Sequence, residues 1–149
     1  MQDTPMEQIR LFEEHDRQKV VDFFAGLGPE TRAFFNRFGS NTRFALKFFD
    51  NDPEDRAQVV RYLAEADGEM VGYSFAWDMH TGIPWFGIVL SDNYKGHGLG
   101  VRMTKTIIDH CGALGKGGIL LTTHTANIRA QVMYEKCGFK VLPYMEMKK

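Results

Sequence analysis

The chain has 149 residues, a hydrophobic share of 44%, an aromatic share of 13% and a formal net charge of −1. This length fits one domain, which we place at residues 1–149, and this composition excludes a disordered chain. The balanced charge gives no reason to expect nucleic acid or an anionic membrane as the main partner, so any anion site must be local.

The sequence carries no clear targeting signal, and its two cysteines suggest neither a disulfide framework nor a metal site. The first residues lack the basic and apolar regions of a signal peptide, and no apolar run reaches the roughly eighteen residues of a spanning helix. Cys111 and Cys137 are too few for a disulfide framework and lack metal-ligand spacing. His110 beside Cys111 makes a poor nucleophile pair, because helical neighbours point about 100° apart. We expect a cytoplasmic protein with reduced thiols, no metal and no membrane partner.

The N-terminal part predicts one strand and two helices. An apolar run at Ile9–Phe12 suits the strand. Asp16 is the expected N-cap of a helix whose apolar residues then follow helical spacing. Gly28–Pro29 stops this helix and starts a second one, which carries Phe34 and Phe35.

A hairpin follows in the middle of the chain. Asn51–Pro53 reads as a turn, and two strands are predicted near Ala57–Ala66 and Met70–Asp78. The dipeptide Asp67–Gly68 between them is a strong hairpin signal. Thr81–Pro84 makes the next turn.

The C-terminal half alternates strands and helices. We predict a strand at Trp85–Leu90, a helix at Val101–Leu114, a strand at Ile119–Thr123, a helix at Asn127–Lys136 and a last strand from Phe139 onward. Antiparallel strands first and a strand–helix–strand crossover later predict a mixed α/β sandwich.

A glycine-rich loop separates the strand at Trp85–Leu90 from the helix that follows. Its glycines let the backbone turn sharply and approach a ligand without Cβ atoms in the way. The helix start adds unpaired N–H groups and a positive dipole end, and a lysine adds a cation. These groups fit a pyrophosphate, although a tight turn without a ligand is the competing interpretation. The loop residues are Lys95, Gly96, His97, Gly98, Leu99 and Gly100.

Two common phosphate motifs do not match this loop. Walker A ends in Gly-Lys-Ser/Thr, whereas Gly100 is followed by Val101 and Arg102. The dinucleotide fingerprint has the spacing G-x-G-x-x-G, whereas this loop reads G-x-G-x-G. A nucleotide-binding protein is therefore the third alternative only.

A second motif lies about thirty residues further on, reading Asn127-x-x-Ala130-x-x-x-Tyr134-x-Lys136-x-Gly138-Phe139. It is similar to motif B of the GNAT family of N-acetyltransferases at every fixed position. Lys95-x-x-Gly98-x-Gly100 resembles motif A of the same family, with lysine in place of arginine or glutamine.

This resemblance implies both a fold and an activity. The GNAT fold is a mixed, mostly antiparallel sheet flanked by helices, with a splayed central strand pair. The implied activity is direct transfer of an acetyl group from acetyl-CoA to an amine of a small molecule or peptide, in a ternary complex and without a covalent enzyme intermediate. The loop from Lys95 to Gly100 would hold the pyrophosphate. A backbone N–H of the segment Ile88, Val89 and Leu90, most plausibly that of Val89 or Leu90, would polarise the acetyl carbonyl.

Two residues of the second motif receive roles. Tyr134 is the candidate general acid for the departing thiolate, with a buried structural tyrosine as the competing interpretation. Asn127 is a natural N-cap and, by resemblance, a hydrogen-bond partner of the pantetheine arm.

The general base is less defined, because Trp85–Leu90 lacks the glutamate that many relatives carry. We favour His124, then His80, since imidazole titrates near neutral pH. Asp78, Asp92 and a chain of water molecules are further candidates.

The acceptor site and the assembly are the least specified features. Leu27–Arg32 looks like a stretch found in one branch of the family, whose first helices wall the acceptor site, so Phe34, Phe35 and Phe38 are candidate lining residues or plain core aromatics. The short chain after Phe139 makes a homodimer plausible. The rival function is a non-catalytic acyl-CoA-binding or regulatory domain. The acceptor stays open.

Overall fold

The computed structural model describes residues 7–36, 42–123 and 126–141. Within these ranges four strands form one antiparallel sheet in the order β1-β2-β3-β4, and each strand pairs with the next along the chain. The alternation of apolar residues and the turn at Asp67–Gly68 produce this meander. The strands are β1 (Gln8–Leu11), β2 (Val60–Ala66), β3 (Glu69–Trp77) and β4 (Trp85–Leu90).

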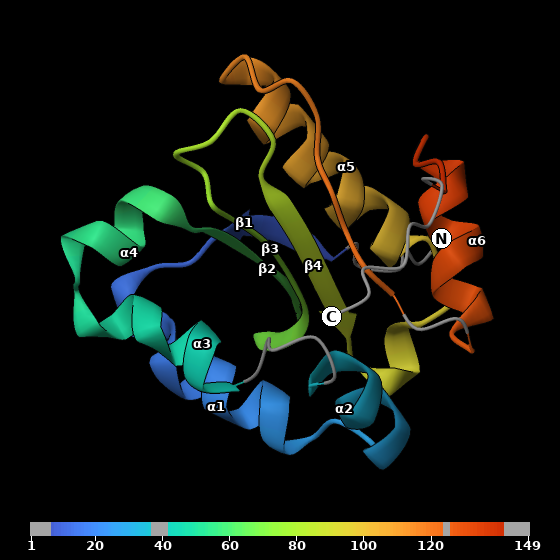
Figure 1. Cartoon of the computed structure of the whole chain (residues 1–149). Coiled ribbons are helices and arrows are strands. Elements are labelled where there is room, and N and C mark those ends of the chain that lie inside the picture. Colours follow the sequence, from blue (N-terminus) through green and yellow to red (C-terminus); the bar gives the residue numbers. More distant parts are fainter. Residues whose placement is uncertain (1–6, 37–41, 124–125, 142–149) are drawn as a thin grey trace, which may run out of the picture.

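Helices cover both faces of the sheet (Figure 1). Helix α5 packs on one face with α6 beside it, and α1, α2 and α3 lie against the other. The helices are α1 (Arg17–Ala25), α2 (Pro29–Asn36), α3 (Thr42–Leu46), α4 (Pro53–Gln58), α5 (Leu99–Ala113) and α6 (Ile128–Lys136). The described part of the chain also contains the short 3-10 helices η1 (Glu14–Asp16), η2 (Lys47–Asp50) and η3 (Asp92–Tyr94).

A buried ion pair fastens the helical layer of α3 and α4 to the sheet. Arg61 donates two hydrogen bonds to Asp55, of 2.8 and 3.0 Å, and both side chains are at most 2% exposed. The guanidinium also donates to the carbonyl oxygen of Phe44 at 2.9 Å. Because each charge is paired and hydrogen-bonded, the cost of burying it is offset.

Two helices before β2 are absent from the sequence prediction. Helix α4 begins at Pro53, directly after the turn at Asn51, where φ is +57°. It takes the first residues of the predicted strand Ala57–Ala66, so the strand begins only at Val60. Pro53 presets the first helical φ, and Asp52 accepts a hydrogen bond from the N–H of Glu54 at 3.0 Å. Helix α3 is too short for its apolar spacing to be read.

The end of α1 and its start also differ from expectation. Asp16 is the N-cap residue of α1, as predicted, but its side chain makes no cap hydrogen bond. Its carboxylate instead accepts two hydrogen bonds from Arg10, of 2.7 and 2.8 Å, which outcompete a neutral cap. The helix ends at Ala25, with Gly26 rather than Gly28 as its C-cap. Arg32 of α2 donates to the carbonyl oxygen of Phe24 at 3.0 Å and so fastens α2 to that end.

The C-terminal segments keep the predicted helices but not the predicted strands. Ile119–Thr123 forms no strand and makes one parallel bridge, between Leu120 and Trp85. Residues 139–141 have no strand structure, and the rest of the predicted last strand lies outside the described residues. Among the described helices none is long and apolar enough to cross a bilayer.

Candidate functional site

The glycine-rich loop joins β4 to α5 through η3. Gly96 and Gly98 have φ values of +80° and +85°, in the left-handed region that favours glycine. An added Cβ at either position would meet no protein atom within 4 Å, so the loop has an open side. Gly98 is the N-cap residue of α5, and its carbonyl oxygen accepts the first helical hydrogen bond, from Arg102 at 3.1 Å.

The backbone N–H groups of this loop are available to a ligand. From Gly96 to Val101 none of them donates a hydrogen bond to any part of the chain that the structure describes. They stand at the N-terminus of a fifteen-residue helix, whose dipole favours an anion there. The side chain of Leu99 is fully buried and holds the helix start against the sheet. The loop therefore offers a row of donors suited to phosphate oxygens.

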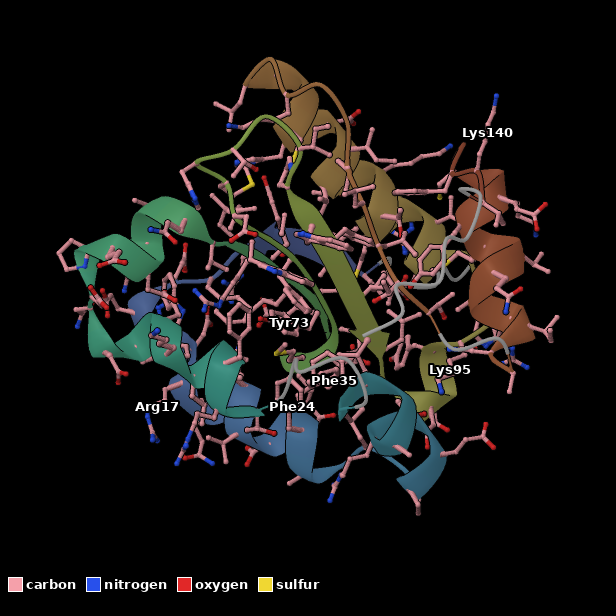
Figure 2. The ribbon with its side chains drawn as sticks, in the orientation of Figure 1. Arg17, Phe24, Phe35, Tyr73, Lys95 and Lys140 are labelled. Carbon is pink, nitrogen blue, oxygen red and sulfur yellow. The ribbon has the colours of Figure 1, made fainter. Side chains whose placement is uncertain are left out.

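Lys95 is engaged by groups of the protein itself. Its ammonium donates to the hydroxyl of Thr31 on α2 and lies 3.7 Å from a carboxylate oxygen of Asp92. Thr31 in turn donates to Asp92 at 2.7 Å. Lys95 thus stands beside the loop, next to the start of α2 (Figure 2).

Strand β4 and the segment around Leu120 run parallel and separate after one bridge. Phe86 donates its N–H to the carbonyl oxygen of Leu120 at 2.8 Å, and Leu120 donates to Pro84 at 3.0 Å. Beyond these two bonds, no hydrogen bond joins β4 to residues 121–123 of the described chain. The remaining length of β4 is therefore splayed from its parallel neighbour, as the resemblance implies.

The alternation of a strand decides which N–H groups face the opening. Ser91 donates to Val71 of the β3 side at 2.9 Å, and the antiparallel register continues this pattern along β4. The N–H of Val89 therefore faces β3, whereas those of Ile88 and Leu90 face the splay. Of the two candidates named from the sequence, Leu90 has the suitable direction.

Tyr134 lies on α6 beside the point where the strands part. Its ring packs edge-on against Phe86, with centroids 6.1 Å apart, and against Phe139 at 5.9 Å. Its hydroxyl makes no hydrogen bond to any residue that the structure describes. Burial raises the pKa of Tyr134 above its ordinary value, and the nearby Cys137 adds to the shift. The phenol thus remains a proton donor throughout the neutral range.

Asn127 caps α6. Its side-chain oxygen accepts a hydrogen bond from the N–H of Ala130 at 3.3 Å. Asn127→Ala is expected to lower the free energy of unfolding by about 1 kcal/mol, because the cap is lost. Asn127→Ser, which keeps an acceptor for the cap but loses the amide donor, serves as the control in chemical denaturation. Equal stability of the wild type and the alanine variant would contradict the capping role.

The sheet face opposite α5 carries a continuous row of aromatic rings. Tyr73, Phe75, Trp77 and Trp85 stack in sequence, with centroids 4.5, 5.6 and 6.2 Å apart. Phe35 of α2 packs edge-on against Phe75 at 6.2 Å, and Figure 2 shows it beside the sheet. Phe34 lies on the same helix, but its side chain is outside the described residues.

Gly87 explains why β4 carries no carboxylate on this face. A Cβ at this position would meet the ring of Phe75 at 2.4 Å, so the ring takes the space that a side chain from β4 would need. This close approach has no local sequence signal, since the two residues belong to different strands.

Of the two histidine candidates for the general base, His80 lies among the described residues and is not at the opening. His80 is exposed in the turn after β3, at the end of β4 opposite the glycine-rich loop. That end is closed, because Lys116 donates to the carbonyl oxygen of Met79 at 2.6 Å and Gly117 donates to Gly82 at 2.7 Å. His124 lies outside the described residues.

The cysteines and their histidine neighbour have structural partners. Cys111 is buried and Cys137 is half-buried, and burial raises the pKa of both thiols. His110 bonds through Nδ1 to the hydroxyl of Tyr62 at 2.9 Å. These contacts leave neither thiol activated as a nucleophile.

Comparison with known proteins gives a family match and similar solved structures, among them three acetyltransferases. Residues 12–139 match the Acetyltransferase (GNAT) family. A GNAT-family acetyltransferase from Streptococcus pneumoniae is similar in structure, with a TM-score of 0.73, 23% identity and coverage of 97% of this chain and 94% of that one. Glucosamine-6-phosphate N-acetyltransferase from Arabidopsis thaliana has a TM-score of 0.69, 21% identity and coverage of 97% and 99%. Spermidine N-acetyltransferase from Vibrio cholerae, in complex with CoA and spermine, has a TM-score of 0.69, 18% identity and coverage of 89% and 79%.

Proposed function

Since the chain belongs to the acetyltransferase (GNAT) family, we propose that it transfers an acetyl group directly from acetyl-CoA to an amine of a small molecule or peptide. Family membership makes it an N-acetyltransferase with acetyl-CoA as the donor. The observation that carries the proposal is the row of N–H groups from Gly96 to Val101 beside the splayed end of β4.

The cofactor site of this proposal runs from the loop to the splay. The N–H groups of Gly96 to Val101 bind the pyrophosphate, and Lys95 supplies a cation beside them. The pantetheine arm enters between β4 and the segment after Leu120, with Asn127 near its path. The unpaired N–H and C=O groups along the open edge of β4 form hydrogen bonds with the pantetheine arm.

Acetyl transfer requires stabilisation of the oxyanion, protonation of the departing thiolate and removal of a proton from the amine. A neutral amine attacks the thioester carbonyl, and the N–H of Ile88 or Leu90 stabilises the developing oxyanion. The C–S bond then breaks, and Tyr134 donates its proton to the thiolate. The amine loses its proton to water or to His124, since His80 lies at the closed end of the sheet.

The acceptor side is assigned to the aromatic face. Phe35 packs edge-on against the buried ring of Phe75, and the half-buried Trp77 stacks on Phe75 and continues the row. Phe34, on the same helix, is a further candidate. Flat aromatic rings bind apolar bodies and attract an ammonium through their π faces. Two similar structures are N-acetyltransferases of glucosamine-6-phosphate and of spermidine, so a small primary amine is the first class to screen.

A non-catalytic acyl-CoA-binding domain on the same fold is the second candidate function. The absence of a carboxylate on β4, where Gly87 admits the ring of Phe75, is the observation that favours it. Such a domain would bind acetyl-CoA and release no thiol with any amine.

The test is thiol release from acetyl-CoA over a panel of primary amines, peptides and polyamines. We expect acceptor-dependent release with at least one amine, together with a product that is one acetyl group heavier by mass spectrometry. Tight binding of acetyl-CoA without release across the panel would instead support the binding domain.

A further inference from the structure

Three side chains connect the glycine-rich loop to helix α2. Thr31 is the centre of this cluster, because its hydroxyl accepts from Lys95 and donates to Asp92 at 2.7 Å. Lys95 and Asp92 also form an ion pair at 3.7 Å. The hydrogen bond between Thr31 and Asp92 spans 61 positions of sequence, so the cluster joins two parts of the chain that are far apart in sequence.

The backbone holds this cluster in place. Gly28 lies so close to Asp92 that an added Cβ would stand 2.3 Å from a carboxylate oxygen. Thr31 is 7% exposed, and Arg32 fastens α2 to the end of α1 through the carbonyl oxygen of Phe24. Asp92 is thus fixed beside the cation of the cofactor site, even though its own side chain is half exposed.

The charges of the cluster bear directly on an anionic ligand. The hydrogen bond from the Thr31 hydroxyl, assisted by the charge of Lys95, holds the pKa of Asp92 below its ordinary value although burial acts in the opposite direction, so the carboxylate is charged at neutral pH. Arg102, the first cationic residue of α5 after the loop, forms an ion pair with Glu7. Lys95 is therefore shared between a fixed carboxylate and any anion bound by the loop.

We propose that Asp92 competes with the coenzyme A pyrophosphate for the ammonium of Lys95, and that it thereby limits the affinity for the cofactor. This inference rests on the proposed function, because it takes the loop as the pyrophosphate site. Asp92 repels the pyrophosphate and partly neutralises Lys95. Thr31 positions both groups, since its hydroxyl bonds to each of them.

The test is calorimetric titration of Asp92→Asn with acetyl-CoA. Asparagine keeps an oxygen to accept from Thr31 but removes the charge, so we expect affinity to rise about five-fold at low salt and the gain to shrink as salt increases. Asp109→Asn is the matched control, since Asp109 is exposed ten positions beyond Leu99 on α5, about 15 Å away along the helix axis. This variant removes the same charge far from the glycine-rich loop and should leave the affinity for acetyl-CoA unchanged.

Two further measurements separate competition from a structural effect. Lys95→Met should weaken acetyl-CoA binding by a larger factor in the Asp92→Asn background than in the wild type, because Lys95 is then unshared. S-Acetylpantetheine, which lacks the pyrophosphate, should bind the wild type and Asp92→Asn equally. Thermal unfolding of each variant checks that it is folded.

The outcomes distinguish this inference from the proposed function. Unchanged or weaker acetyl-CoA binding by a folded Asp92→Asn variant would overturn the competition alone, as would an equal gain with S-acetylpantetheine. No binding of acetyl-CoA by the wild type would overturn the proposed function and the competition together.

Discussion

Gly98→Val is expected to weaken acetyl-CoA binding roughly 10- to 100-fold while leaving the protein folded. The φ of +85° at this residue disfavours a branched side chain, at a cost of about 1–3 kcal/mol. No protein atom lies within 4 Å of the new Cβ, so the valine side chain meets the bound pyrophosphate rather than the core. Calorimetry gives the affinity, and circular dichroism checks the fold.

Gly115→Val provides the matched control. Gly115 has a φ of +75° and equally open surroundings, but it follows the C-terminal end of α5 rather than its start. The same strain is therefore imposed away from the loop. We expect a similar loss of stability and an unchanged affinity. Equal affinities of Gly98→Val and the wild type would refute the role of the loop.

Tyr134→Phe is expected to lower kcat about 100-fold or more, with little change in acetyl-CoA affinity. The substitution removes only a hydroxyl that has no hydrogen-bond partner among the described residues, and the ring contacts with Phe86 and Phe139 persist. Loss of the proton donor leaves a thiolate as the departing group, which slows collapse to products. Initial rates of thiol release with a saturating amine measure the effect.

Tyr62→Phe is the corresponding control. Tyr62 loses a hydroxyl that bonds to His110 and belongs to β2, where it takes no part in the proposed chemistry. Its kcat should stay near that of the wild type. A Tyr134→Phe variant with full activity would remove Tyr134 from the mechanism and leave protonation to solvent.

The parts of the site predicted from the sequence depend on local backbone chemistry. Glycine at positions that need a left-handed φ, and asparagine as an N-cap, each act within one turn of their own position. Residues 96–100 and Asn127 therefore mark the loop and the start of α6 before any tertiary contact is known. The family assignment over residues 12–139 confirms the resemblance based on these two motifs.

The parts not predicted depend on contacts between distant segments. Nothing near Asp92 indicates that Thr31 will bond to it, and nothing near Gly87 indicates the ring of Phe75. The segment after Ile119 has the composition of a strand, yet among its described residues only Leu120 pairs with β4, because the two segments diverge at the splay. Strand composition describes which residues fit a sheet, whereas the neighbouring segments decide where pairing stops.

The most direct test of the central claim is calorimetric titration of the wild-type protein with acetyl-CoA, with ATP as the control ligand. We predict micromolar binding of acetyl-CoA and no heat with ATP, because the loop lacks the Walker A lysine and hydroxyl. The absence of acetyl-CoA binding at millimolar ligand would contradict the account, since neither the enzyme nor the binding domain could then operate.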